Sequence, residues 1–314
     1  MRVAVVGAGI SGLTAALRLA EAGHEVRVVA AALPEATTSW VAAALWYPYR
    51  ALPQEAVTRW AAGTFDVLAE LVQSPGAGVQ MRIGRELFLQ QAPDPWWRDA
   101  VPSLDRVAAA DLPAGYRDGY LLQVPVVDVS VHLPWLVALL LARGVRIAEQ
   151  RLTTLEQADP WADAVVDCTG LGAAALTGDD RLVPVRGQVV LVGQVGVDQW
   201  LLAQSEGEAL TYVVPRERTV VLGGTADVGA TDLHPDAATA AAVVERCAAL
   251  VPALRDAPVL AHRVGLRPTR SSVRLEAGRL ADGRPVVHDY GHGGAGVTLS
   301  YGCAADVVRL VATL

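Results

Sequence analysis

The sequence is poor in the residues and patterns that mark several classes of protein. It has three cysteines, Cys168, Cys247 and Cys303, which are far apart and form no C-x-x-C pair. An odd number of separated cysteines indicates reduced, mostly buried thiols in a cytoplasmic protein rather than a disulfide framework. Its six histidines show neither H-x-x-x-H nor histidine–carboxylate spacing, so we expect no metal site.

Charge and hydropathy exclude two further kinds of partner. The formal net charge of −7 argues against nucleic acid, because phosphate binding requires a basic surface. No apolar run reaches the roughly 18 residues of a membrane span, so we expect no membrane association. With 52% hydrophobic and 19% charged residues in a chain of 314, the composition indicates a compact globular protein long enough for two domains. The composition is also compatible with a homodimer.

The strongest feature present is a glycine-rich turn between a strand and a helix near the start of the chain. Residues 3–6 form an apolar, β-branched run typical of a buried parallel strand, and residues 10–22 predict a helix. The glycines between and within them, at G-x-G-x-x-G spacing, are Gly7, Gly9 and Gly12. Such glycines permit a tight turn and close approach to a pyrophosphate. With a second strand over 23–29, this unit predicts dinucleotide binding; the alternative is a glycine turn without a ligand.

The second strand ends without the acidic residue that usually binds a ribose hydroxyl in such sites. Ala31 and Ala32 stand there instead, so an arginine for a 2′-phosphate is missing too. Thr37, Thr38 and Ser39 follow. Their hydroxyl groups suit phosphate oxygens, but they could equally cap a helix over 41–45. Both interpretations stay open.

The rest of the chain alternates between two kinds of segment. Residues 51–127 lack a strand–helix–strand rhythm, which resumes over 128–183 and is interrupted again over 184–276. A second glycine-rich loop, with four glycines between residues 291 and 296, then leads into a predicted helix over 297–312. The other expected elements are helices over 54–71, 128–143 and 236–250, a strand pair within 79–90, strands at 120–125, 144–148, 163–170, 184–192, 211–215 and 219–224, and strand and loop over 259–276.

Longer motifs make the chain resemble the FAD-dependent D-amino-acid oxidase family, which also holds D-aspartate oxidase. The motifs are Ala43-Ala-Leu-Trp-Tyr-Pro-Tyr49, Val166-Asp-Cys-Thr-Gly170, Arg186-Gly-Gln188, Tyr212-Val-Val-Pro215, Gly265-Leu-Arg-Pro-Thr-Arg-Ser-Ser-Val-Arg-Leu-Glu276 and Tyr290-Gly-His-Gly-Gly-Ala-Gly-Val-Thr298. The resemblance implies an α/β fold with a Rossmann-like FAD-binding domain and an inserted mixed-sheet substrate-binding domain. The first would comprise 1–50, 128–183 and 277–314, and the second 51–127 and 184–276.

The resemblance also implies roles for single residues. Arg270 and the hydroxyl of Tyr212 would bind the substrate carboxylate, and the carbonyl of Gly294 would bind its amine. A guanidinium suits this role because its planar donors match a carboxylate; the alternatives are a solvated charge for Arg270 and an ordinary half-buried tyrosine for Tyr212. The residues implied to contact FAD are Gly7, Ala8, Gly9, Ile10, Ser11, Gly12, Thr37, Thr38, Ala44, Leu45, Leu152, Thr169, Gly170, Gly293, Gly296, Val297 and Thr298.

Three residues, Tyr47, Glu208 and Ala226, are expected to shape the substrate pocket. Glu208 and Ala226 stand at positions where family members commonly carry a second tyrosine. A smaller residue at 226 would widen the mouth, and a carboxylate at 208 would repel an acidic side chain. Arg216 could offset that charge, but we expect it to point to solvent. Neutral, fairly bulky substrate side chains should therefore be favoured.

The implied reaction is oxidative deamination of a D-amino acid. A hydride passes from Cα to the flavin, the imino acid hydrolyses to a 2-oxo acid and ammonia, and molecular oxygen is reduced to hydrogen peroxide. His288 and His292 invite a general-base role, but loop histidines flanked by glycine more often cap backbone groups. No protein base is needed if the amine arrives neutral.

Several alternatives remain at this stage. Within the superfamily they are a D-aspartate oxidase and a glycine-type oxidase. From other classes they are an NAD(P)-dependent dehydrogenase and a non-catalytic flavin-binding protein. A dehydrogenase would not need the second glycine loop, and a binding module would not need Arg270 or Tyr212.

Overall fold

The computed structural model describes residues 1–205 and 210–314; Glu208 therefore lies outside the described residues. The helices are α1 (Ile10–Glu21), α2 (Gln54–Leu71), α3 (Val129–Ala142), α4 (Ala173–Thr177), α5 (Ala237–Leu250) and α6 (Gly296–Val311). The strands are β1 (Arg2–Val6), β2 (Glu25–Ala30), β3 (Val79–Phe88), β4 (Asp105–Arg106), β5 (Asp118–Val127), β6 (Arg146–Glu149), β7 (Ala164–Asp167), β8 (Val183–Gly193), β9 (Trp200–Gln204), β10 (Leu210–Pro215), β11 (Thr219–Gly223), β12 (Asp227–Val228), β13 (Val259–Arg279) and β14 (Pro285–His292).

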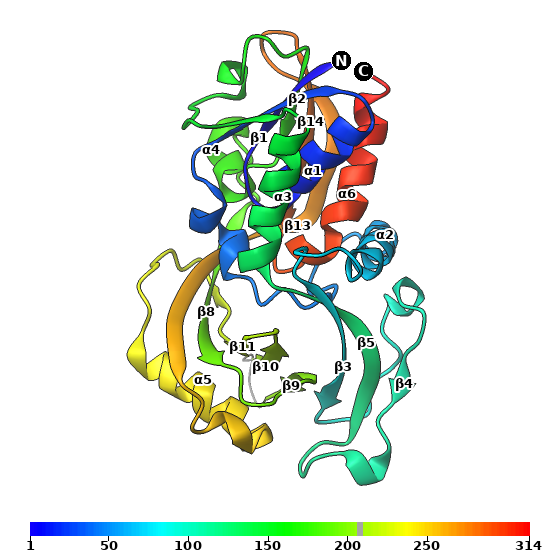
Figure 1. The fold of residues 1–314 in the computed structure, drawn as a ribbon, viewed down its shortest axis with the longest axis vertical. Helices are drawn as coiled ribbons and strands as arrows, with labels where there is room; N and C mark the ends of the chain where they lie inside the picture. Colours follow the sequence, from blue (N-terminus) through cyan, green and yellow to red (C-terminus); the bar gives the residue numbers. More distant parts are fainter. Residues whose placement is uncertain (206–209) are drawn as a thin grey trace.

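One half of the molecule is a parallel sheet in the order β14-β7-β1-β2-β6. The apolar run in β1 pairs with strands on both edges, which is why its side chains are buried on both faces. Helices α1, α3 and α6 lie together beside this sheet, in the half that also holds both chain termini (Figure 1). This arrangement confirms the predicted Rossmann-like architecture.

The other half is a mixed sheet in the order β4-β5-β3-β9-β10-β11-β8. β3 and β9 are parallel, whereas the other neighbours are antiparallel, and α5 packs against one face. The predicted strand pair within 79–90 is wrong, because β3 runs unbroken. Gly84 allows this: a Cβ there would lie 2.2 Å from the ring of Trp200 on the neighbouring strand.

β13 joins the two halves (Figure 1). It is a single 21-residue strand, where the sequence predicted strand and loop. β8 pairs with its first part and β14 with its last part, so its backbone groups find partners along most of its length. The register shifts between Thr269 and Arg274. The boundaries predicted for the two domains stay predictions, since one continuous sheet spans both halves.

The segment after β2 does not form the helix that was one interpretation of residues 41–45. Instead, a 3-10 turn covers Thr38–Val41, and Ala44 adopts a positive φ of 58°. Arg216 explains the irregular backbone, because its guanidinium donates to the carbonyls of Ala42 (2.7 Å) and Ala43 (3.4 Å). The expectation that Arg216 points to solvent is wrong: its side chain is 3% exposed and pairs with Asp128.

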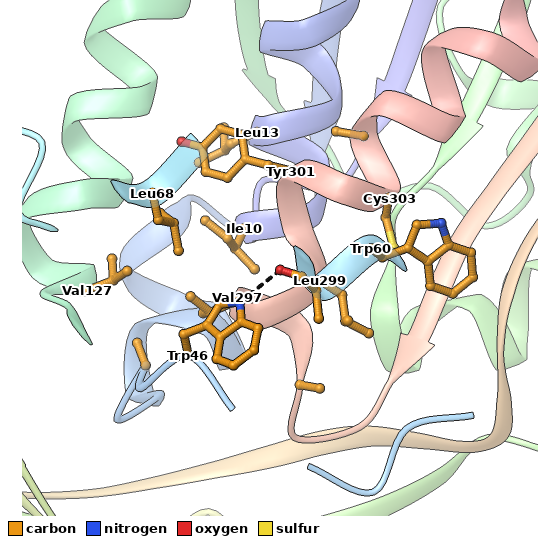
Figure 2. Close-up of a cluster of buried hydrophobic side chains, with 14 of the residues drawn as sticks. Ile10, Leu13, Trp46, Trp60, Leu68, Val127, Val297, Leu299, Tyr301 and Cys303 are labelled. Carbon is orange, nitrogen blue, oxygen red and sulfur yellow. Dashed lines mark hydrogen bonds between the residues drawn. The ribbon is translucent and has the colours of Figure 1, made fainter. Parts of the chain in front are cut away.

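The two halves share a hydrophobic core beside α6. Ile10, Trp46, Val297 and Leu299 converge there (Figure 2). Helix α2 approaches α6 so closely that a Cβ on Gly302 would lie 2.1 Å from the carbonyl oxygen of Trp60. The start of α6 is therefore held by elements from both halves.

Within the described ranges, no helix combines the length and the apolar character needed to cross a membrane.

Candidate cofactor and substrate site

A cavity of about 710 Å³ runs from the carboxyl ends of β1 and β2 to the sheet formed by β8–β11. Such a position, at the carboxyl edge of a parallel sheet, is where ligands bind in open α/β folds. The cavity brings together most of the residues predicted from sequence. Those that line it are Gly7, Ala8, Gly9, Ile10, Ser11, Thr37, Thr38, Ala44, Leu45, Tyr47, Leu152, Thr169, Gly170, Tyr212, Ala226, Gly293, Gly294, Gly296, Val297 and Thr298.

The turn between β1 and α1 fits a dinucleotide. Gly7 has a φ of +119°, and a Cβ on it would lie 2.4 Å from the carbonyl oxygen of Cys168. A Cβ on Gly12 would lie 2.0 Å from the carbonyl oxygen of Gly7. Gly12 does not line the cavity but lets α1 pack against the turn, so that the amino end of the helix faces the space where phosphates would bind.

Serine and threonine side chains complete this part of the cavity. The hydroxyl oxygen of Ser39, which also lines the cavity, accepts a hydrogen bond from the amide of Ile10 at 3.0 Å. Thr38 donates to the carbonyl oxygen of Leu266 at 3.1 Å. Thr37 likewise donates to the carbonyl oxygen of Pro34 at 2.7 Å, so all three hydroxyl groups bind backbone groups. Because no helix forms over 41–45, the cap interpretation is wrong, and the phosphate-facing interpretation stays a prediction.

At the end of β2 the cavity is lined by Ala31 and Ala32, with Gln150 and Arg151 opposite. The amide of Gln150 donates to the carbonyl oxygen of Ala30 at 2.7 Å, which continues the pairing of β6 with β2. Arg151 is exposed and forms no ion pair with any described residue. Sequence reasoning did not single out this glutamine and arginine, because they precede no recognisable motif.

A positively charged side chain, that of Arg267, lies at the other end of the cavity. Its Nη1 donates to the carbonyl oxygen of Thr225 at 2.9 Å. The guanidinium lies over Gly187, because a Cβ on that glycine would be 2.5 Å from both terminal nitrogens of Arg267. A Cβ on Gly294 would be 3.5 Å from Cδ of Arg267. The ring of Tyr49 lies against the same glycine, since a Cβ on Gly294 would be 2.8 Å from Cδ1 of that ring. Arg267 therefore stands beside two residues implicated in substrate binding, Tyr212 and Gly294.

The predicted role of Arg270 must be corrected, because the structure places it outside the cavity lining. Its side chain is 5% exposed, and its Nε donates to the carboxylate of Asp179 at 2.9 Å. Burial would raise the pKa of Asp179, but hydrogen bonds from Arg181, Tyr290 and Arg270 hold it well below its usual range. Arg270 is thus part of a buried ion pair that supports the fold. Arg267, three residues earlier in the same motif, was missed.

Tyr212 lies on β10 with its ring against two glycines. A Cβ on Gly223 would lie 1.9 Å from Cζ of that ring, and one on Gly224 would lie 2.7 Å from its hydroxyl. Burial raises the pKa of Tyr212, and the charge of Arg267 opposes the shift. The hydroxyl therefore stays protonated near neutral pH and can donate a hydrogen bond.

Tyr47 joins the cofactor side of the cavity to the substrate side. Its amide and carbonyl both hydrogen-bond the hydroxyl of Thr298 at 3.0 Å, in the first turn of α6. Its own hydroxyl contacts both carboxylate oxygens of Glu86, at 2.8 and 2.9 Å. Glu86 is a residue that the sequence did not indicate.

Both histidines considered as bases are held by buried carboxylates rather than by backbone groups. His288 Nδ1 lies 3.0 Å from Asp167, and His292 Nε2 lies 3.0 Å from Asp289. His292 lines the cavity, whereas His288 does not. These contacts fix the loop before α6.

One group among the described residues has the composition of a metal site: Asp289, His292 and Cys303, with donor atoms within 4.8 Å of one another. Hydrogen bonds already account for it, because Asp289 accepts from His292 and also from Cys168 at 3.7 Å. Burial raises the pKa of the Cys303 thiol well above its usual range, whereas a metal ligand must be deprotonated. The expectation of no metal stays a prediction.

A comparison with protein families matches residues 2–310 to the FAD dependent oxidoreductase (DAO) family. The chain belongs to this family. FAD is accordingly its cofactor, and the glycine turn, the hydroxyl cluster and the amino end of α6 are the parts of this oxidoreductase that fit it.

Curated relatives of this oxidoreductase cover nearly its full length. It is 47% identical to a D-amino-acid oxidase of Rubrobacter xylanophilus, over 98% of this chain and 95% of that protein. It is 46% identical to a D-amino-acid oxidase of Streptomyces coelicolor, over 98% and 96%. It is also 35% identical to the human D-aspartate oxidase, over 99% and 94%.

A solved structure supports the fold. The glycine oxidase of Bacillus cereus superimposes with a TM-score of 0.82 over 99% of this chain and 95% of that one, at 18% identity. This oxidoreductase therefore has the predicted α/β architecture.

Proposed function

We propose that this enzyme oxidises D-amino acids to 2-oxo acids, ammonia and hydrogen peroxide. The observation that carries the proposal is the guanidinium of Arg267, which faces the cavity beside Tyr212 and Gly294, at the end opposite Ala31 and Arg151. A carboxylate is the substrate group that such a cation recognises best. The names of the two relatives at 47% and 46% identity also support it.

The protein binds and orients the substrate. Arg267 uses one Nη1–H on Thr225 and keeps other donors for a two-pronged contact with the carboxylate. The protonated hydroxyl of Tyr212 donates to the same carboxylate, and the carbonyl of Gly294 accepts from the amine. A bound FAD would supply the acceptor for the hydride from Cα and the route of its two electrons to oxygen, and the amine would lose a proton as the imine forms. Water then converts the imino acid to the 2-oxo acid and ammonia.

The amino end of α6 contributes electrostatically. Gly296, Val297 and Thr298 line the cavity at the first turn of this helix. The positive end of the helix dipole favours negative charge there, worth about 0.3–1 kcal/mol at exposed sites and more where water is excluded. Neither candidate histidine is required as a base, because the lone pair of a neutral amine assists loss of the hydride.

We propose that neutral side chains are preferred over acidic ones. The described residues that line the cavity include two arginines, Arg267 and Arg151, and Arg151 lies at the far end beside Ala31. A side-chain carboxylate would thus have no second cation. Arg216, the alternative considered from sequence, is buried against Asp128. Ala226 leaves room for a bulky side chain, and the role of Glu208 lies outside the described residues.

The test is spectroscopic. The purified protein should be yellow, should bleach under anaerobic conditions with D-methionine or D-phenylalanine, and should recolour in air with release of peroxide. L-enantiomers serve as the control. The proposal fails if no D-amino acid bleaches the flavin. If D-aspartate is the best substrate, the enzyme is a D-aspartate oxidase instead.

A cytoplasmic location is proposed from the three buried, unpaired cysteines, because free thiols persist in reducing compartments. A homodimer remains a prediction, which light scattering on the purified protein can test.

A further inference from the structure

Glu86 is a buried carboxyl group beside the substrate end of the cavity. It lies on β3 directly opposite Leu202 of β9. Neighbouring residues in register on parallel strands point to the same face of a sheet, and Leu202 lines the cavity. Glu86 therefore faces the cavity side, where its carboxyl group accepts hydrogen bonds from the hydroxyl of Tyr47, a residue that lines the cavity.

This carboxyl group has no cationic partner among the described residues. It is 7% exposed, and burial raises its pKa to about 7 against the opposing effect of the Tyr47 hydrogen bond. The titratable groups around it are Tyr47 and Tyr120, which lies directly opposite Glu86 on the neighbouring strand β5. Arg106 stacks on the outer side of Tyr120 and is already paired with Asp94 and Asp118. The charge of Glu86, once formed, is therefore not cancelled locally.

We propose that Glu86 determines which substrate side chains the cavity accepts, because its negative charge lies directly behind Tyr47, in the wall that the substrate side chain meets. The ionised form disfavours anionic side chains, and the protonated form does not. This inference rests on the proposed oxidation of D-amino acids. Glu86 is not a catalytic residue, because Tyr47 lines the cavity and Glu86 does not.

The geometry makes the charge effective at a distance. Tyr47 has its backbone fixed to Thr298 and its ring edge packed against Trp97, with centroids 5.3 Å apart. The contact with Trp97 and the hydrogen bonds to Glu86 hold the phenol in place. In such a weakly polarisable wall an unpaired charge acts over several ångströms with little screening.

The experiment compares D-glutamine with D-glutamate, which differ only in the charge of the side chain. The ratio of their kcat/KM values removes effects common to both, such as titration of the substrate amine and the reaction with oxygen. In the unmodified enzyme the ratio should rise by roughly three- to tenfold between about pH 5.5 and about pH 8.5. In Glu86→Gln, which keeps a partner for the Tyr47 hydroxyl, it should be flat.

Tyr47→Phe is the matched control, because it removes the hydrogen bond but leaves the carboxyl group. The ratio should still depend on pH, with its midpoint at a higher pH, because the Tyr47 hydrogen bond lowers the pKa of Glu86. If Glu86→Gln does not fold, Glu86→Met replaces it. The inference is overturned if the ratio does not change with pH in the unmodified enzyme, or if it changes equally in Glu86→Gln. Turnover of D-methionine would still support the proposed function in either case. Absence of turnover with every D-amino acid overturns both.

Discussion

Arg267 and Arg270 offer the sharpest test of how the site works. Both lie in one motif on β13, three residues apart, and both can be replaced by methionine, which has a similar length and no charge. Arg267 lines the cavity, whereas Arg270 pairs with Asp179 away from it. The two substitutions should therefore impair different properties of the protein.

The magnitudes follow from what each guanidinium contacts. In Arg267→Met the substrate carboxylate loses its charged partner in a partly buried site, which costs about 2–5 kcal/mol. At about 1.4 kcal/mol per factor of ten, kcat/KM should fall by at least about thirtyfold. The fold should change little, since Arg267 makes one hydrogen bond to Thr225 and no ion pair with a described residue. In Arg270→Met, by contrast, Asp179 loses one of its charged donors, and removing one partner of a buried pair costs about 3–5 kcal/mol of stability.

Peroxide release with D-methionine gives kcat/KM, and urea unfolding gives the free energy of unfolding. The expected pattern is low activity with near-normal stability for Arg267→Met, and lowered stability for Arg270→Met. Activity of Arg270→Met should be measured where the variant is still folded. The reasoning is refuted if Arg267→Met retains more than a fifth of the activity, or if Arg270→Met is the variant that loses activity while remaining stable.

Three further predictions concern stability and the cofactor. Folding raises the pKa of Glu86 from 4.5 to about 7, so the unmodified protein should lose about 3 kcal/mol of stability as pH rises between these two values. Urea unfolding of Glu86→Gln should show no such loss, and the same pH dependence in this variant would contradict the prediction. Ala31→Asp should tighten FAD binding about tenfold by restoring a charged hydrogen bond to the ribose, as measured by quenching of flavin fluorescence. The prediction is wrong if the unmodified protein already binds FAD with a sub-micromolar dissociation constant that Ala31→Asp does not improve. Gly12→Ala should weaken FAD binding and lower the melting temperature, because its Cβ would lie 2.0 Å from the carbonyl oxygen of Gly7, and overpacking costs about 1–3 kcal/mol; normal binding in this variant would count against a close helix–turn contact.

Much of the cofactor half could be predicted from sequence, because its signals are local. The β-branched run of β1 and the glycines after it are contiguous, and each reports on its own backbone conformation. The same holds for the second glycine loop before α6, where Gly291 and Gly293 adopt positive φ angles. These two loops meet in one cavity because parallel strands present their carboxyl ends at one edge of a sheet.

Prediction was weaker where a segment depends on its neighbours. The residues 41–45 could have continued a helix, but Arg216 from a distant strand binds their carbonyls. β13 was expected to break, but strands on both sides satisfy its backbone. Local propensity cannot reveal a partner that lies far away in the chain.

The sequence by itself determined that this chain binds a dinucleotide and that the fold is α/β, and the family resemblance predicted a carboxylate-binding arginine within 265–276. Only the tertiary structure shows which arginine of that motif lines the cavity. Residues 267 and 270 are separated by an odd number of positions, so on an extended strand they point to opposite faces. Which face borders the cavity depends on how β13 lies between β8 and β14. The buried contact between Tyr47 and Glu86 likewise exists only once segments from two parts of the chain have packed together.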